Sequence, residues 1–185
     1  MNMLNKWNYD PQGEVCYGQE IVYQKARDFL GDTVEDWGCG TCWAKRYFTN
    51  YKGIDGSPHP NVDVIADLTT YTSKADNILI RQVLENNYDW KLILANAVKS
   101  FQKKLCITIH TPMVETTKII CVYVKDVGFL TTATAISANK DSIPDISFRL
   151  QDILDYFTGL KVTIEEVPTA PFEYGTETLI YVEKV

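Results

Sequence analysis

Short runs of β-branched and aliphatic residues alternate with longer amphipathic segments along most of this 185-residue chain. Such alternation is typical of an α/β domain, in which helices connect the strands of a largely parallel sheet. The predicted strands cover residues 33–37, 51–55, 62–67, 77–84, 104–110, 161–167 and 177–185. We therefore expect one three-layer α/β domain over residues 1–185, with a mostly parallel, seven-stranded sheet and an antiparallel strand at its edge.

Four segments between these strands have helical character. They cover residues 17–31, 42–48, 89–102 and 147–159. In the first, apolar residues recur at helical spacing up to Gly31, which is expected to end the helix. The third carries its expected buried face at Leu92, Ile93, Ala97 and Phe101. Residues 113–142 fit either an inserted strand pair or a loop.

The composition excludes several classes of protein. The net charge of −6 argues against nucleic-acid binding, which usually requires a basic surface. The apolar runs are too short to span a bilayer, so we expect no membrane association. Residues 1–14 lack the apolar core of a secretory signal, and the five cysteines are scattered. These features favour a cytoplasmic protein with reduced thiols.

The stretch VEDWGCGTCWAKRYF, residues 34–48, allows two interpretations. Cys39 and Cys42 form a C-x-x-C pair, which suggests a thiol redox site. Gly38 and Gly40 instead suggest a glycine-rich turn that lets the backbone approach a nucleotide. Zinc binding is disfavoured because neither a second C-x-x-C pair nor paired histidines complete a tetrahedral set.

The residues after the next two strands favour the nucleotide turn. Such a turn should be followed, about 20 residues on, by an acid that accepts hydrogen bonds from ribose hydroxyls. Asp55 occupies that place, and Gly56 follows it. Asp67 ends the third predicted strand, where it could reach an adenine amino group. Acids at successive strand ends are expected to meet, because ligands bind at the carboxyl ends of the strands in such sheets.

The ordered set of motifs resembles the class I S-adenosylmethionine-dependent methyltransferases. VEDWGCGTCW resembles that family's first motif, GIDGS the second and ADL the third. VLENNYDW is similar to a V-L-E-H segment that follows the fourth strand, with Asn86 in the place of the histidine. The resemblance covers residues 17–185 and implies a Rossmann-like fold. It also implies S-adenosylmethionine as the cofactor and S-adenosylhomocysteine as the product.

The resemblance assigns cofactor-binding roles to several positions. Asp36 is expected to orient the turn, and Arg81 and Gln82 to line the middle of the cofactor. The complete expected set is Tyr17, Asp36, Gly38, Cys39, Gly40, Asp55, Gly56, Asp67, Leu68, Arg81 and Gln82. One departure is Cys42, which stands where the family usually has a third glycine.

Fewer residues of the sequence indicate where the methyl acceptor binds. His110 ends the fifth predicted strand and is the candidate general base, although a histidine there is often only structural. Glu85 and Tyr88 are candidates for the wall of the cleft. The N-terminal residues 1–30, as a helix and lid, and the insertion at 113–142 would complete the acceptor pocket.

Three hypotheses follow. The first is methyl transfer to a small molecule, a sugar or a peptide; DNA is disfavoured because no acidic or Asn residue followed by Pro-Pro-aromatic comes after the fourth strand. The second is a regulatory protein that binds S-adenosylmethionine without catalysis. The third is a thiol oxidoreductase that uses Cys39 and Cys42.

Overall fold

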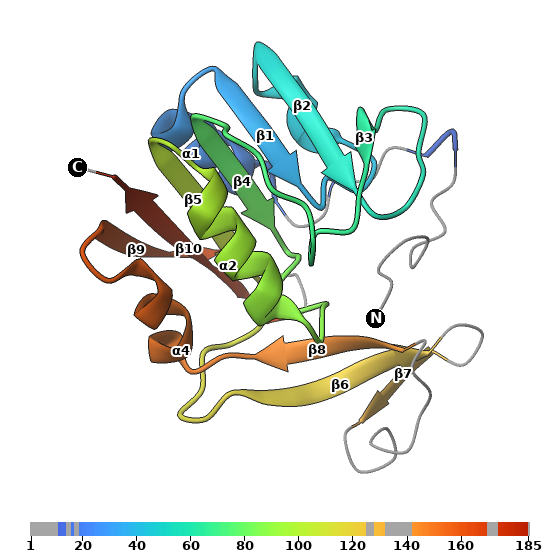
Figure 1. Cartoon of the computed structure of the whole chain (residues 1–185). Helices are drawn as coiled ribbons and strands as arrows, with labels where there is room; N and C mark the ends of the chain where they lie inside the picture. Colours follow the sequence, from blue (N-terminus) through green and yellow to red (C-terminus); the bar gives the residue numbers. More distant parts are fainter. Residues whose placement is uncertain are drawn as a thin grey trace.

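A seven-stranded sheet forms the centre of the molecule (Figure 1). The computed structural model describes residues 11–13, 16, 19–124, 128–131, 142–169 and 174–184. In spatial order the strands are β3 (Val64–Ile65), β2 (Asn50–Asp55), β1 (Thr33–Trp37), β4 (Asn77–Arg81), β5 (Lys104–Ile109), β10 (Thr176–Glu183) and β9 (Lys161–Pro168). The strand order reverses beside β1, because β2 and β4 lie on its opposite sides.

The strand directions confirm the predicted sheet. Strands β1 to β5 are parallel to one another, whereas β10 is antiparallel to both β5 and β9. The antiparallel strand therefore lies one place in from the edge. The central strand β4 reads NILIR, and Ile78, Leu79 and Ile80 are all fully buried. A continuous apolar run is what a strand needs when both faces of its sheet are covered.

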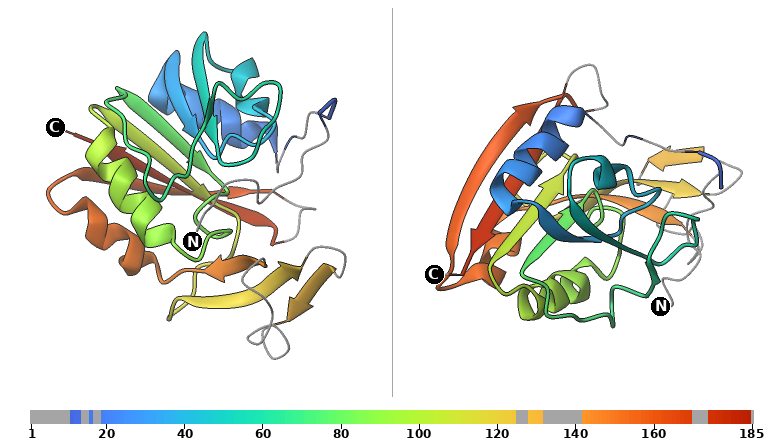
Figure 2. Two further views of the ribbon diagram at one scale, coloured as in Figure 1. Left: turned by 45° about the vertical axis from the view of Figure 1, so that its right-hand side comes forward. Right: turned by 90° about the horizontal axis from the view of Figure 1, so that it is seen from above.

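Helices cover the two faces of the sheet (Figure 2). Helix α1 (Glu20–Leu30) packs on one face, where Val22, Ala26 and Leu30 join a buried cluster with side chains of β1, β4, β5 and β10. Helix α2 (Trp90–Ser100) packs on the other face, together with α4 (Leu150–Leu154) and the 3₁₀ helix η2 (Asp155–Phe157). The three-layer sandwich is thus confirmed.

Several local predictions were wrong. The helix expected at 42–48 is only a short 3₁₀ helix, η1 (Trp43–Arg46). The helix expected at 147–159 is reduced to α4 and η2, and a strand precedes it. The third strand contains two residues rather than six. On α2, Leu92 is 53% exposed because it lies beside the buried face rather than on it.

Three strands between residues 118 and 147 form a second, antiparallel sheet. Strand β6 (Lys118–Val124) lies between β7 (Gly128–Thr131) and β8 (Ile143–Ser147). Within residues 113–142 the described strands are β6 and β7, which is the strand pair rather than the loop, and β8 follows directly after this segment. Strand β8 is anchored to the main core, because Ile146 N donates to Glu85 O at 2.9 Å and Ile146 itself is buried in that core.

Candidate functional site

The carboxyl ends of β1, β2, β4 and β5 lie along one edge of the main sheet. The strand order reverses beside β1, because the chain passes from β1 to β2 on one side and β4 lies on the other. The loops that follow β1 and β4 therefore begin next to each other. In open α/β sheets, this is where ligands bind. The sequence-predicted site residues of β1, β2, β4 and β5 are brought together along this edge.

The glycine turn after β1 has the expected backbone. Gly38 and Gly40 have φ values of 78° and 56°, which lie in the left-handed region that favours glycine. A Cβ on Gly38 would lie 2.3 Å from Val83 Cγ2. Glycine is therefore required at position 38 both by its φ and by the close approach of the segment that follows β4.

Cys42 adopts the left-handed conformation at the position of the missing third glycine. Its φ is 64°, and its Sγ lies 3.3 Å from Cys39 Sγ. Both sulfur atoms pack over Gly53 of β2, where a Cβ would lie 2.9 Å from each. The hydrogen bond with Cys42 and burial raise the pKa of Cys39 far above its ordinary value. A thiol in this state is a poor nucleophile, which argues against the thiol oxidoreductase hypothesis.

Asp55 ties the end of β2 to the glycine turn. Its Oδ2 accepts a hydrogen bond from Gly40 N at 2.8 Å, and its Oδ1 accepts one from Ser57 N at 2.7 Å. The residue is only 5% exposed. Asp55, the acid of the second motif, is therefore held at the turn. Gly56 lies between Asp55 and Ser57.

Asp67 lies on the loop after β3. Its Oδ1 accepts hydrogen bonds from Thr69 N at 2.9 Å and from Thr69 Oγ1 at 2.7 Å. The neighbouring Leu68 is buried. The start of this loop is fixed to β2, because Ala66 N donates to Asp55 O at 2.9 Å. Asp55 and Asp67 thus lie on adjoining segments.

Asp36 lies beneath the turn in a fully enclosed position. It is 3% exposed, and Tyr51 donates a hydrogen bond to its Oδ2 at 2.7 Å. Burial raises the pKa of Asp36 to about 7, and the hydrogen bond from Tyr51 opposes this rise only in part. The expected role of Asp36 in orienting the turn stays a prediction.

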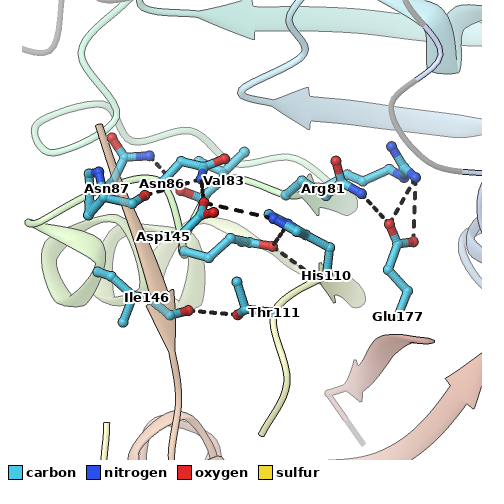
Figure 3. A network of polar contacts seen from close by, with 12 residues as sticks. Arg81, Val83, Asn86, Asn87, His110, Thr111, Asp145, Ile146 and Glu177 are labelled. Atoms are coloured by element: carbon cyan, nitrogen blue, oxygen red, sulfur yellow. Dashed lines mark hydrogen bonds and ion pairs between the residues drawn. The ribbon is translucent and has the colours of Figure 1, made fainter. Parts of the chain in front are cut away.

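Arg81 and Gln82 meet a residue that the sequence analysis missed. Arg81 Nη2 lies 3.1 Å from Glu177 Oε1 in a buried ion pair, and Gln82 also donates to Glu177 (Figure 3). Arg81 Nη1 donates to Tyr23 Oη at 2.9 Å. The side chain of Arg81 is thus directed toward α1 and β10. No local pattern marked Glu177, because it pairs with Arg81 across 96 positions of sequence.

His110 lies between two carboxylates (Figure 3). Its Nδ1 is 2.7 Å from Glu85 Oε1, and its Nε2 is 3.9 Å from Asp145 Oδ1. Burial would lower the pKa of His110, but the hydrogen bond to Glu85 and the charges of Glu85, Asp145 and Glu177 raise it above its ordinary value. Since a carboxylate only accepts hydrogen bonds, Nδ1 must carry a proton. Nε2 is then the nitrogen that can exchange a proton with a ligand.

Asp145 is the second residue that sequence analysis missed, because β8 was not predicted. Asn86 Nδ2 donates to Asp145 Oδ1 at 2.9 Å, and Cys121 Sγ lies 3.1 Å from Oδ2. Tyr88 is directed toward the same sheet, since its Oη lies 2.7 Å from Ser142 Oγ. Tyr17 and the first ten residues of the expected lid lie outside the described residues.

The residue set fits the cofactor implied by the motifs. The turn lies between buried acids on β1 and β2, and a third acid lies on the loop joined to β2. Carboxylates suit the hydroxyl and amino groups of an adenosyl ligand, while a turn with positive φ values lets the backbone come close. The described part of the chain contains no group of three or more His, Cys, Asp or Glu side chains arranged so that they could hold a metal ion, and no helix long and apolar enough to cross a membrane.

Comparisons with known proteins agree with this architecture. No family model matches the sequence, and no curated protein matches it. Among solved structures, magnesium protoporphyrin IX methyltransferase from Synechocystis is similar over 89% of this chain and 76% of its own, with a TM-score of 0.54 and 12% identity. An S-adenosylmethionine-dependent methyltransferase from Mesorhizobium loti is similar over 86% of this chain and 96% of its own, with a TM-score of 0.54 and 11% identity.

A third similar structure is the cyclase SpnF. It covers 89% of this chain and 80% of its own, with a TM-score of 0.55 and 13% identity. At these identities the likeness shows the fold: the chain has the Rossmann-like fold of the class I methyltransferases.

Proposed function

We propose that this chain binds S-adenosylmethionine at the turn of residues 38–42 and transfers the methyl group to a small-molecule, sugar or peptide acceptor. The observation that carries the proposal is the bridge from Gly40 N to Asp55 Oδ2, at 2.8 Å, beside the point where the strand order reverses. It joins the glycine turn and the ribose-binding acid, the two parts that a nucleotide site of this kind requires.

Each residue of the site has a defined task in this proposal. Asp55 accepts hydrogen bonds from the ribose and Asp67 binds the adenine amino group, while Asp36 supports the turn from below. When bound, the cofactor supplies a methyl group on a sulfonium, which is a good leaving group. The chain has only to hold an acceptor atom in line with that methyl, and positioning alone can lower such a barrier greatly. His110 Nε2 can take a proton from the acceptor.

Calorimetric titration with S-adenosylmethionine and S-adenosylhomocysteine tests the cofactor. We expect saturable binding of both, and a loss of about 10- to 100-fold in affinity for Asp55→Ala, as is usual when a hydrogen bond to a charged group is removed. Asp55→Asn, which keeps one acceptor oxygen, should lose less. Asp76→Ala, at the opposite end of β4, is the control and should bind normally. Unchanged affinity of Asp55→Ala would show that the ribose assignment is wrong.

A binding protein without transferase activity is the second candidate. It is favoured by Cys42, whose thiol fills space beside β2 where the family has glycine. SpnF also shows that this fold occurs in a protein described as a cyclase, so fold alone does not decide activity. Formation of S-adenosylhomocysteine in the presence of an acceptor supports methyl transfer, whereas binding without turnover across all acceptor classes supports the second candidate.

A further inference from the structure

We infer that Glu85, His110 and Asp145 form a binding site for a protonated primary or secondary amine, and that this amine is the methyl acceptor. The binding site stands on the geometry of the three residues. The assignment of the amine as acceptor rests on the proposed function.

The segment after β4 places this cluster next to the cofactor turn. Val83 lies against Gly38, close enough that a Cβ there would come within 2.3 Å of Cγ2. Two residues further on, Glu85 Oε1 accepts hydrogen bonds from both His110 N, at 2.9 Å, and His110 Nδ1, at 2.7 Å. One short stretch of chain therefore contacts the glycine turn at one end and the histidine at the other.

The distance between His110 and Asp145 suits a bridging nitrogen. His110 Nε2 and Asp145 Oδ1 are 3.9 Å apart, which is too long for a direct hydrogen bond. A single ligand nitrogen can nevertheless lie about 2.8 Å from both atoms, at the apex of a triangle. It would donate one N–H to the carboxylate and one to the imidazole. The side chain of His110 is 21% exposed, so a ligand can reach it.

The charges of the cluster favour a cation. Glu85 is completely buried, and its Oε2 has no hydrogen-bond partner among the described residues. The nearby Glu177 is balanced by Arg81 in their ion pair. Glu85 and Asp145 therefore leave one negative charge uncompensated even when His110 is protonated, and two when it is neutral. An anionic acceptor would be repelled here, whereas an ammonium group supplies the missing charge.

Neighbouring groups support the same ligand. Asn86, in the segment after β4, and Cys121 of β6 hold the Asp145 carboxylate, with contacts of 2.9 Å and 3.1 Å. The Tyr174 ring lies 5.9 Å from the ring of His110, centroid to centroid. An aromatic ring suits a site for an alkylammonium ion, because the face of the ring carries negative potential.

The reaction balances with these groups. The bound ammonium gives one proton to His110 Nε2, and Glu85 stabilises the resulting imidazolium. The freed nitrogen lone pair forms the new N–C bond as the S–C bond breaks, and the sulfur keeps that electron pair. The products are a methylated ammonium and a neutral thioether, while the proton stays on His110 until it passes to water.

The chain offers a direct test, because it contains only two histidines. We would record ¹⁵N-histidine NMR spectra of the whole chain, without cofactor, while titrating benzylamine, the isosteric benzyl alcohol, or benzoate. Benzylamine should shift the signals of His110 and lower its apparent pKa by about one unit, because a bound positive charge opposes protonation. His59, whose Nδ1 accepts from Asn61 N at 3.2 Å, is the internal control and should not move.

Two variants distinguish the effect of the charge on Asp145 from the effect of the net charge of the chain. Asp145→Asn should weaken benzylamine binding about tenfold and leave benzyl alcohol unaffected. Asp76→Asn removes the same charge from the far edge of the sheet and should bind like the unchanged chain. The inference is overturned if benzylamine shifts His110 no more than benzyl alcohol or benzoate does, or if Asp145→Asn binds benzylamine normally.

The calorimetric experiment keeps the two proposals apart. If S-adenosylhomocysteine binds but His110 shows no preference for the amine, this inference fails and the proposed cofactor site stands. If His110 binds the amine but neither cofactor form binds, the amine site stands and methyl transfer is excluded.

Discussion

At the scale of single residues, the left-handed backbone conformation of Cys42 shows why position 42 favours glycine. A side chain at φ 64° costs about 1 kcal/mol relative to glycine, and the cost is borne here by a residue whose sulfur packs on Gly53 and Cys39. The motif therefore keeps its shape although its third glycine is replaced.

We predict that Cys42→Gly is more stable than Cys42→Ala by about 1 kcal/mol. Both changes remove the thiol, so their difference isolates the backbone conformation. Urea unfolding of the two variants measures it. The control is Ala44→Gly, two residues later in η1, where glycine should instead destabilise by about 0.5–1 kcal/mol. Equal stability of the two Cys42 variants would contradict the strained conformation.

Asp36 makes stability depend on pH. The pKa of Asp36 is about 7 in the folded chain, above its ordinary value of 3.8, chiefly because of burial. Between these values the folded chain holds a proton that the unfolded chain has lost. The contribution of Asp36 is therefore fully present below pH 3.8 and is lost as the pH rises toward about 7.

We expect Asp36→Asn to remove the loss of stability that ionisation of Asp36 causes. Relative to the unchanged chain, its free energy of unfolding should increase by a few kcal/mol, in order of magnitude, from about pH 4 to about pH 7, and then level off. Urea unfolding at several pH values measures this difference. Asp76→Asn, an exposed carboxyl, serves as the comparison. A constant difference across this range would show that Asp36 is ionised throughout.

At the scale of elements, prediction succeeded where the hydrophobic pattern is strong and local. Strand 33–37 was predicted with its observed bounds, because apolar residues at 34 and 37 are flanked by turn signals. It failed at β8, whose residues IPDIS include a proline and an aspartate and are buried only because β6 and the main core cover them. The partners of the site residues, Glu177 and Asp145, come from such distant pairings and leave no mark in the local sequence.

Helix α2 allows the burial of neighbouring apolar residues to be tested. Ile93 is fully buried, whereas Leu92, predicted to be buried, is 53% exposed. We expect Ile93→Ala to destabilise the chain by about 2–4 kcal/mol and Leu92→Ala by less than about 0.5 kcal/mol. Thermal or urea unfolding of both variants measures the two effects on one helix. Comparable losses would mean that α2 is rotated from the described position.

At the scale of the whole molecule, the second sheet is attached to the main core through the buried Ile146 of β8 and through Ile119 of β6. Thr111 Oγ1 donates to Ile146 O at 2.6 Å, and the Phe148 ring lies 4.9 Å from the Trp90 ring, centroid to centroid. By contrast, most side chains of β6 are half-exposed. Strand β6 therefore has fewer buried side chains than β8.

We predict that β6 and β7 open independently of the main sheet. In native-state hydrogen exchange, the amides that join these two strands should exchange at least about tenfold faster than those of β4 and β5. The amide of Ile146 should follow the main sheet, since it donates to Glu85 O. Equal protection of β5 and β7 would show instead that both sheets unfold as one unit.

The position of β10 also decides when the fold can form during synthesis. This strand occupies residues 176–183 yet lies between β5 and β9, and it supplies the Glu177 partner of Arg81. While the ribosome still holds these residues, β5 has an unpaired edge and Arg81 lacks its counter-ion. The nascent chain must therefore carry an incomplete sheet until β10 emerges, a stage at which exposed strand edges make chaperone protection valuable.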